Sequence, residues 1–294
     1  MSPHPPRHGQ AVVFMLAASA FVAGASLIAK ALGAGDGLHP FQVSAGRFFF
    51  AFIALITLFA VRPALRPTLQ TEVPALHLAR VVLGWLGVSA MFAAVALMPV
   101  ADATAISFLN PALAVLLAVV FLGESLTARK VIACVLSLSG AVLILRPGGE
   151  AFQPAAFLAL AAAGFMAVEI ILIKRLSDTE PPTRILLINN AIGAVISVSV
   201  AFFFWSAPTP MQWSLLIGVG VVMVSAQGLF LQAMTRSEAS FVSPVFYSVL
   251  IFAAMLDFLI YAVAPTVFTL VGSALILAGA VLLGMQRSGG GRIH

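Results

Sequence analysis

The sequence has very little charge. Only 9% of its 294 residues are Asp, Glu, Lys or Arg, whereas 62% are hydrophobic, and the mean hydropathy is +1.11. A soluble domain usually carries roughly 25% charged residues, because its surface faces water. This chain has too little charge to coat a soluble particle of its size. The composition therefore predicts a protein whose solvent is the lipid bilayer.

Cysteine and clustered histidine are lacking too. Cys134 is the only cysteine, which excludes an intrachain disulfide and a cysteine-ligated metal cluster. The five histidines are scattered through the termini and the expected loops. No phosphate-binding loop, dinucleotide fingerprint or Ser/His/Asp arrangement stands out. We therefore expect no cofactor, no metal and no enzymatic activity.

The net charge of +5 does not indicate nucleic acid as a partner. The basic residues fall in short loops and form no patch with interleaved aromatic residues. Positive charge retained on the cytoplasmic side of a membrane explains them better.

Ten apolar stretches follow one another along the chain with short polar connections. A helix needs about 20 residues to cross the hydrocarbon layer. The first stretch exceeds the roughly 7–15 apolar residues of a signal peptide, so we interpret it as an uncleaved span. The ten predicted spans are 11–32, 41–61, 81–98, 103–122, 131–145, 152–173, 185–205, 213–234, 239–263 and 267–285.

The distribution of Lys and Arg predicts the orientation. If the N-terminus is inside, the regions that fall inside hold 12 of the 15 basic residues, and the opposite side holds only Arg146. Lys30 and Arg47 lie at or within spans. The positive-inside rule then places both termini in the cytoplasm of a multi-pass protein in a bacterial-type inner membrane.

A proline motif in the fourth predicted span recurs in the ninth. The letters SFLNP at 107–111 return as SFVSP at 240–244. Thirteen residues after each proline comes an acid, Glu124 in the first half and Asp257 in the second. The two segments are five spans apart.

Two further matches have the same separation. LIAKAL at 27–32 resembles ILIKRL at 171–176, and GAVL at 140–143 recurs at 279–282. Because five is an odd number, the second half enters the membrane from the opposite side. We therefore predict an all-α membrane protein of ten transmembrane helices in two inverted five-helix repeats, with a binding site near the midplane.

Several motifs in this order resemble the EamA-type transporters of the drug/metabolite transporter superfamily. They are ALMPVADA at 96–103, Asn110-Pro111, the LGE turn ending at Glu124, RPG at 146–148, PVFY at 244–247 and DFL at 257–259. The resemblance covers nearly the whole chain. It implies one EamA-like repeat over 1–146, a second, inverted repeat over 147–294, and transport of amino acids or other small metabolites without ATP.

Ionisable residues inside the spans are candidate site residues, because a charge in hydrocarbon is costly unless it is paired or faces water. Glu169 is expected either to bind a substrate ammonium group or carry a proton, or to pair with Lys174, Arg175 or Arg184. Arg47 is expected either to bind a substrate carboxylate or to extend to the outer headgroups, which we favour.

The other acids and Lys30 have simpler interpretations. We expect Asp257 to be a solvated carboxylate at the outer interface and Lys30 to lie at the same interface. Glu124 is expected to form a loop contact or a helix cap beside Arg129 and Lys130.

Neutral polar residues complete the candidate binding set. Asn110, Gln227, Tyr247 and Trp85 are expected to supply hydrogen bonds, or otherwise to join helices or anchor them at an interface. Pro111 and Pro244 are expected to kink their helices and expose backbone acceptors to a central cavity.

The leading hypothesis is a secondary transporter that exports amino acids or similar small metabolites by alternating access. Its partners would be the small-molecule substrate and the bilayer, and not nucleic acid. The sequence does not predict the oligomeric state. Uptake of a metabolite such as S-adenosylmethionine, or export of lipophilic cations, would use the same fold. An intramembrane enzyme would need clustered His, Cys or paired carboxylates, and a channel would need polar stripes.

Overall fold

The computed structural model describes residues 8–35, 37–68, 70–122, 127–145, 154–177, 179–234, 236 and 245–284. Within these ranges all regular structure is helical, as predicted. The helices are α1 (His8–Gly33), α2 (Pro40–Val61), η1 (Pro63–Leu65), α3 (Pro74–Leu97), α4 (Val100–Ser107), α5 (Asn110–Leu122), α6 (Ala128–Leu145), α7 (Pro154–Ser177), α8 (Pro182–Ala201), η2 (Phe202–Phe204), α9 (Pro210–Met234), α11 (Val249–Tyr261) and α12 (Val267–Gly284). Seven segments of this described part are long and apolar enough to cross a membrane.

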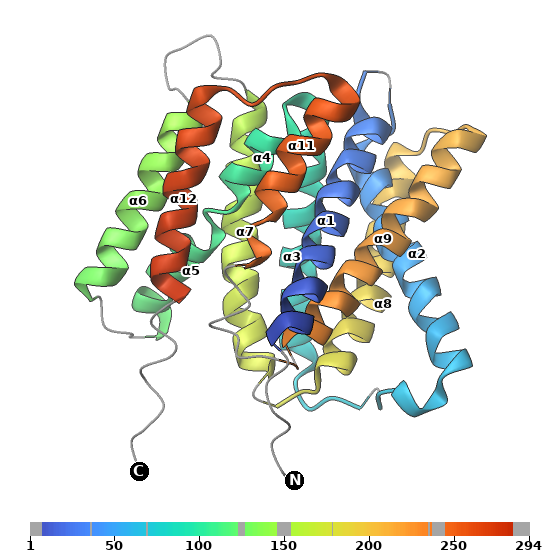
Figure 1. Cartoon of the computed structure of the whole chain (residues 1–294). Coiled ribbons are helices and arrows are strands. Elements are labelled where there is room, and N and C mark those ends of the chain that lie inside the picture. Colours follow the sequence, from blue (N-terminus) through green and yellow to red (C-terminus); the bar gives the residue numbers. More distant parts are fainter. Residues whose placement is uncertain are drawn as a thin grey trace, which may run out of the picture.

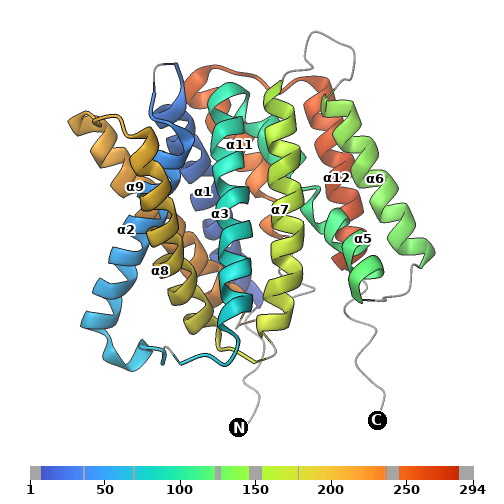
Figure 2. The same ribbon diagram turned by 180° about the vertical axis from the view of Figure 1, so that it is seen from behind.

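The helices stand side by side in one bundle (Figure 1, Figure 2). The pair α6 and α12 forms one side, and α2, α8 and α9 form the other, with α1, α3, α4, α7 and α11 between them. α1 begins and α12 ends at the same end of the bundle, which is the lower end in Figure 1. We call it the lower end and the opposite one the upper end.

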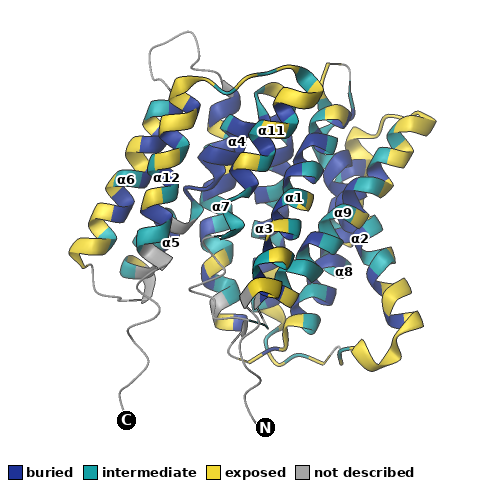
Figure 3. Cartoon of the chain, viewed as in Figure 1, coloured by how far each residue is buried: buried dark blue, intermediate teal, exposed yellow. Residues whose placement is uncertain are grey.

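Apolar side chains cover the outside of the bundle. Phe49, Ile53 and Ile56 of α2 are each more than 40% exposed, and the yellow residues in Figure 3 follow the outer faces of α2 and α6. A soluble monomer rarely exposes large apolar patches. These faces therefore suit contact with lipid.

The core is built largely from small residues, which allow the helices to approach closely. Ala25 and Ala29 of α1, Ala94 of α3, and Ala159 and Ala163 of α7 are almost completely buried. Little side-chain volume separates these backbones, so polar groups on the same helices are excluded from lipid.

The third and fourth predicted spans differ from the structure. α3 begins at Pro74 rather than near residue 81, because a proline is well tolerated at the first position of a helix. His77 and Arg80 therefore lie in the helix and are buried, whereas we expected them outside the span. The predicted span 103–122 is two helices, α4 and α5, separated at residues 108–109.

The break before α5 has a simple physical cause. α4 ends at Ser107, four residues before Pro111, which has no backbone N–H to bond the Ser107 carbonyl. The break between α4 and α5 thus coincides with Pro111, whose side chain, like all of Pro244, lies outside the described residues. Glu124 lies outside them as well.

Candidate functional site

The main polar feature inside the bundle is an ion pair between α3 and α7. Arg80 Nη2 lies 3.1 Å from Oε1 of Glu169, and the two side chains are only 11% and 17% exposed. Gly84, one turn after Arg80, makes room for the carboxylate. A Cβ atom at position 84 would lie 2.7 Å from Glu169 Oε1.

This arrangement corrects the expected partners of Glu169. The carboxylate pairs with Arg80, a residue outside the predicted third span, and not with Arg175 or Arg184, while the side chain of Lys174 lies outside the described part of the chain. Arg184 pairs with Glu180 instead. The sequence signal that identifies Arg80 is the small residue at i+4, because Gly84 marks a close approach by a neighbouring helix.

Arg47 lies beside this pair. It is 4% exposed, so the expectation that it extends to the headgroups is wrong. Its guanidinium carbon lies 3.9 Å from the centre of the Phe48 ring. It interacts electrostatically with Glu169 and Arg80, but its Nε and Nη1 atoms have no hydrogen-bond partner in the described part of the chain.

Aromatic rings support Arg47 from one side. Phe48 packs in a cluster with Trp85, and Trp85 stacks on Phe41 with ring centres 5.4 Å apart. Gly193 of α8 lies directly against the Phe48 ring, so a larger residue there would displace it. The buried Nε1 of Trp85 also has no partner among the described residues.

The remaining predicted site residues are dispersed around this group. Asn110, at the start of α5, places its Nδ2 atom 4.0 Å from the sulfur of Met166, which is three residues before Glu169. Tyr247 contacts the Phe108 ring, with centres 5.2 Å apart. The buried Oε1 of Gln227 on α9 has no partner among the described residues. The structure therefore groups Glu169, Arg47 and Trp85, with Asn110 nearby.

An apolar groove of about 650 Å³ opens between α3, α5 and α7. Leu83 and Val168, which precede Gly84 and Glu169 in the sequence, form part of its lining, together with Leu113 and Phe165. The volume is within the range of small-molecule sites. All of its lining residues are apolar, and neither Arg80 nor Glu169 is among them.

A second buried ion pair joins the two halves of the chain toward the upper end. Lys30 Nζ lies 2.8 Å from Oδ1 of Asp257, and Asp257 is 1% exposed. The other carboxylate oxygen accepts hydrogen bonds from the backbone N–H groups of Val100, at 2.6 Å, and Ala101, at 3.4 Å. Asp257 is therefore not the solvated carboxylate that we expected, because it caps α4 and neutralises Lys30.

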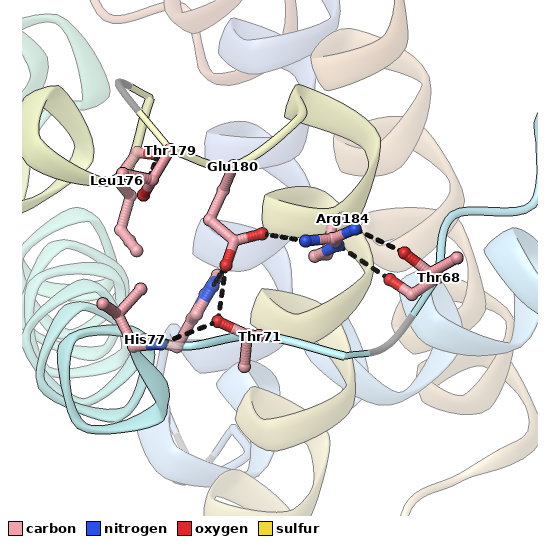
Figure 4. A network of polar contacts seen from close by, with 8 residues as sticks. Thr68, Thr71, His77, Leu176, Thr179, Glu180 and Arg184 are labelled. Carbon is pink, nitrogen blue, oxygen red and sulfur yellow. Dashed lines mark hydrogen bonds and ion pairs between the residues drawn. The ribbon is translucent and has the colours of Figure 1, made fainter.

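A polar network closes the lower end between the loop 62–73 and the loop before α8 (Figure 4). Glu180 accepts hydrogen bonds from Thr71, at 2.5 Å, and from Arg184, at 2.6 Å. Arg184 also donates to the backbone oxygen and the hydroxyl of Thr68. The Thr71 hydroxyl and Arg184 hold the pKa of the Glu180 carboxyl below its ordinary value, although burial opposes them.

A multi-pass helical bundle with lipid-facing apolar surfaces and a buried, incompletely paired charge cluster is typical of membrane transporters. The chain belongs to the EamA-like transporter family, whose model matches residues 9–146 and 153–285. It is accordingly a small-metabolite transporter and not an enzyme.

Similar proteins support this assignment. The chain is 30% identical over 250 residues to an S-adenosylmethionine uptake transporter of Rickettsia bellii, covering 85% of each chain. It is 24% identical to the pseudopaline exporter CntI of Pseudomonas aeruginosa, over 82% of this chain and 86% of that one. It is 25% identical to a riboflavin transporter of Vibrio cholerae, over 93% and 92%.

A solved crystal structure has the same fold. It superposes with a TM-score of 0.62 at 20% identity and covers 95% of this chain and 98% of its own.

Proposed function

We propose that the protein is a secondary transporter that exports amino acids or similar small metabolites by alternating access without ATP. The observation that carries this proposal is Arg47, a buried guanidinium next to the Arg80–Glu169 pair with two donor atoms unused. A charge in that position costs several kcal/mol unless something pairs with it. A polar substrate that enters the bundle supplies the missing partner.

The mechanism rests on an inverted repeat, which the packing of the helices supports. In this repeat α1 corresponds to α7, α2 to α8 and α3 to α9. The contact of α1 with α9 then corresponds to that of α7 with α3, and the contact of α2 with α9 corresponds to that of α8 with α3. The contact of α1 with α11 corresponds to the contacts of α7 with α4 and α5. All of these pairs pack against each other.

The crossing of α6 and α12 supports the same symmetry at the level of single residues. Gly140 lies against the Gly272 carbonyl and Ile276, while Gly279 lies against the Ala133 carbonyl and Ser137. The GAVL match gives an offset of 139 residues, which pairs position 140 with 279 and position 133 with 272. The contacts of Gly140 on α12 therefore correspond to the contacts of Gly279 on α6.

The loop contacts at the two ends are also paired. Gln42, third in α2, bonds the backbone oxygen of Ser206 at 2.7 Å and accepts from its hydroxyl. Arg184, third in α8, bonds the backbone oxygen and hydroxyl of Thr68 at the other end. In alternating access, such equivalent contacts close one side or the other of a fixed site.

We further propose that the lower end is cytoplasmic, in line with the positive-inside rule. Two exposed alanines, Ala34 after α1 and Ala64 in η1, lie beyond opposite ends of the bundle. In a Cys134→Ala background, a membrane-impermeant thiol reagent added to intact cells should label Ala34→Cys and spare Ala64→Cys. The reverse pattern contradicts this orientation.

The uptake of an S-adenosylmethionine-like substrate is the second candidate, because the Rickettsia relative is named for uptake. One experiment separates the candidates. Proteoliposomes are loaded with, or immersed in, a labelled panel of amino acids, S-adenosylmethionine and riboflavin, with and without a pH gradient. Net transport away from the cytoplasmic face of the protein supports export, and net transport toward that face supports uptake. If no compound moves, both candidates are contradicted.

A further inference from the structure

The charges around Arg47 do not balance. Arg47 and Arg80 carry two positive charges, and Glu169 is the acid that interacts with both of them in the described part of the chain. Arg80 takes the direct ion pair with Glu169 at 3.1 Å. One positive charge therefore remains, and it belongs to a side chain that is 4% exposed.

The geometry also fixes which atoms of Arg47 are unused. Its Nε and Nη1 atoms are both buried without a partner among the described residues. Each of these atoms lies next to Nη2, so an entering carboxylate can pair either Nε–H or Nη1–H with an Nη2–H group in the two-point geometry that gives some of the strongest hydrogen bonds in proteins. The Phe48 ring packs against this guanidinium, with its centre 3.9 Å from the guanidinium carbon.

From these observations we propose that Arg47 binds the carboxylate of the transported molecule and that Glu169 positions Arg80 rather than binding an ammonium group. The substrate class is then organic acids and amino acids with a free carboxylate. This inference rests on the proposed function and assigns the substrate class of the same site.

The same charge count argues against cationic substrates. A lipophilic cation would enter a site that already has an excess positive charge, and the acid there is already paired with Arg80. Like charges at short range in a poorly hydrated site repel strongly. A substrate ammonium group is tolerated when a carboxylate comes with it, but it contributes little to binding.

Three compounds that share a phenyl ring test this proposal, and the aromatic cluster of Phe41, Phe48 and Trp85 suits that ring. L-Phenylalanine has both charges, 3-phenylpropionate only the carboxylate, and L-phenylalaninamide only the ammonium group. Each competes in proteoliposomes against a labelled compound that the wild type transports. The two acids should compete at least tenfold better than the amide.

Variants of the full-length protein assign the effect to Arg47. Arg47→Gln should abolish the preference for the acids, and Arg47→Lys, which keeps the charge, should restore part of it. Arg62→Gln is the matched control, because Arg62 caps the same helix and is exposed. Since Arg47 has no full partner in the empty protein, Arg47→Gln should unfold at a temperature equal to or above that of the wild type.

The outcomes separate this inference from the proposed function. If the wild type transports no compound of the panel, the proposed function fails. If it transports some of them but the amide competes as well as the acids, the function stands and the carboxylate inference is overturned. A preference that survives in Arg47→Gln, or failure of 3-phenylpropionate to compete, also overturns it.

Discussion

Arg80 and Glu169 form an ion pair, 3.1 Å between Nη2 and Oε1, that connects the two halves of the chain through α3 and α7. In the proposed repeat the equivalent contact is the one between α9 and α1, and it cannot contain such a pair because α9 (Pro210–Met234) has no charged residue. The charge cluster is therefore a feature of one side of the proposed repeat. We expect it to define substrate binding rather than the symmetric movement itself.

The first prediction concerns the stability of this pair. Glu169→Gln leaves Arg80 and Arg47 buried without a negative charge, so it should destabilise the protein by about 3–5 kcal/mol. Removing both charges of the pair, in Arg80→Gln with Glu169→Gln, should cost less than the sum of the single changes. Thermal unfolding in one detergent measures all three. Additive effects would show that the two side chains do not depend on each other.

The second prediction concerns the space that Gly84 provides. Gly84→Ala places a Cβ 2.7 Å from Glu169 Oε1, so the carboxylate must move and its bond to Arg80 must lengthen. We expect lower thermal stability and reduced transport. Gly228→Ala in α9 is the control, because a Cβ there has no atom within 4 Å. It should be neutral or slightly stabilising, as alanine is the better helix former. Equal effects of the two substitutions would contradict the close contact.

The third prediction concerns Asp257. Asp257→Asn removes the charge that neutralises Lys30 and weakens the cap on α4. Truncating one partner of a buried pair is expected to cost about 3–5 kcal/mol. Adding Lys30→Met should recover part of this loss, because it removes the uncompensated ammonium group. The unfolding temperatures of the single and double variants test this prediction. A double variant that is less stable than Asp257→Asn would refute the pairing.

The fourth prediction is a pH dependence at the lower end. The folded protein holds the pKa of Glu180 below its ordinary value, so the charged form stabilises the fold. This contribution is present above the unfolded pKa of about 4.3 and is lost as the pH falls through the lower folded value. Between these values the unfolding temperature of the wild type should fall, while that of Glu180→Gln should change less.

Glu72→Gln is the control for this experiment, because Glu72 lies in the same loop and is exposed. Its pH profile should match that of the wild type. A Glu180→Gln profile that also matches the wild type would remove the proposed role of the network in Figure 4.

Much of the fold could be predicted from the sequence, because lipid imposes strong constraints on a spanning helix. The apolar stretches of the sequence located the ends of α1, α2 and α9 to within a few residues. The start of α3 was missed because Arg80 was taken as the end of a loop. Hydropathy cannot distinguish a basic residue at the interface from one whose counter-charge, here Glu169, comes from a helix far away in the sequence.

The candidate site was predicted only in part, for the same reason. Burying an isolated charge in the membrane costs several kcal/mol, so the simpler expectation was that Arg47 extends to the headgroups. The structure instead buries Arg47 against the Phe48 ring, within electrostatic range of the Arg80–Glu169 pair. Contacts between distant segments decide such cases, and one sequence does not contain them. The proline break before α5, in contrast, follows from local chemistry alone.

The central claim is that transport depends on Arg47. Its most direct test is the transport rate per folded protein molecule in proteoliposomes, for the wild type, Arg47→Gln and Arg62→Gln, with a panel compound that the wild type moves. Arg62→Gln should transport at the wild-type rate, whereas Arg47→Gln should lose at least nine-tenths of it, corresponding to at least about 1.4 kcal/mol. A stably folded Arg47→Gln protein that transports at the wild-type rate would contradict it.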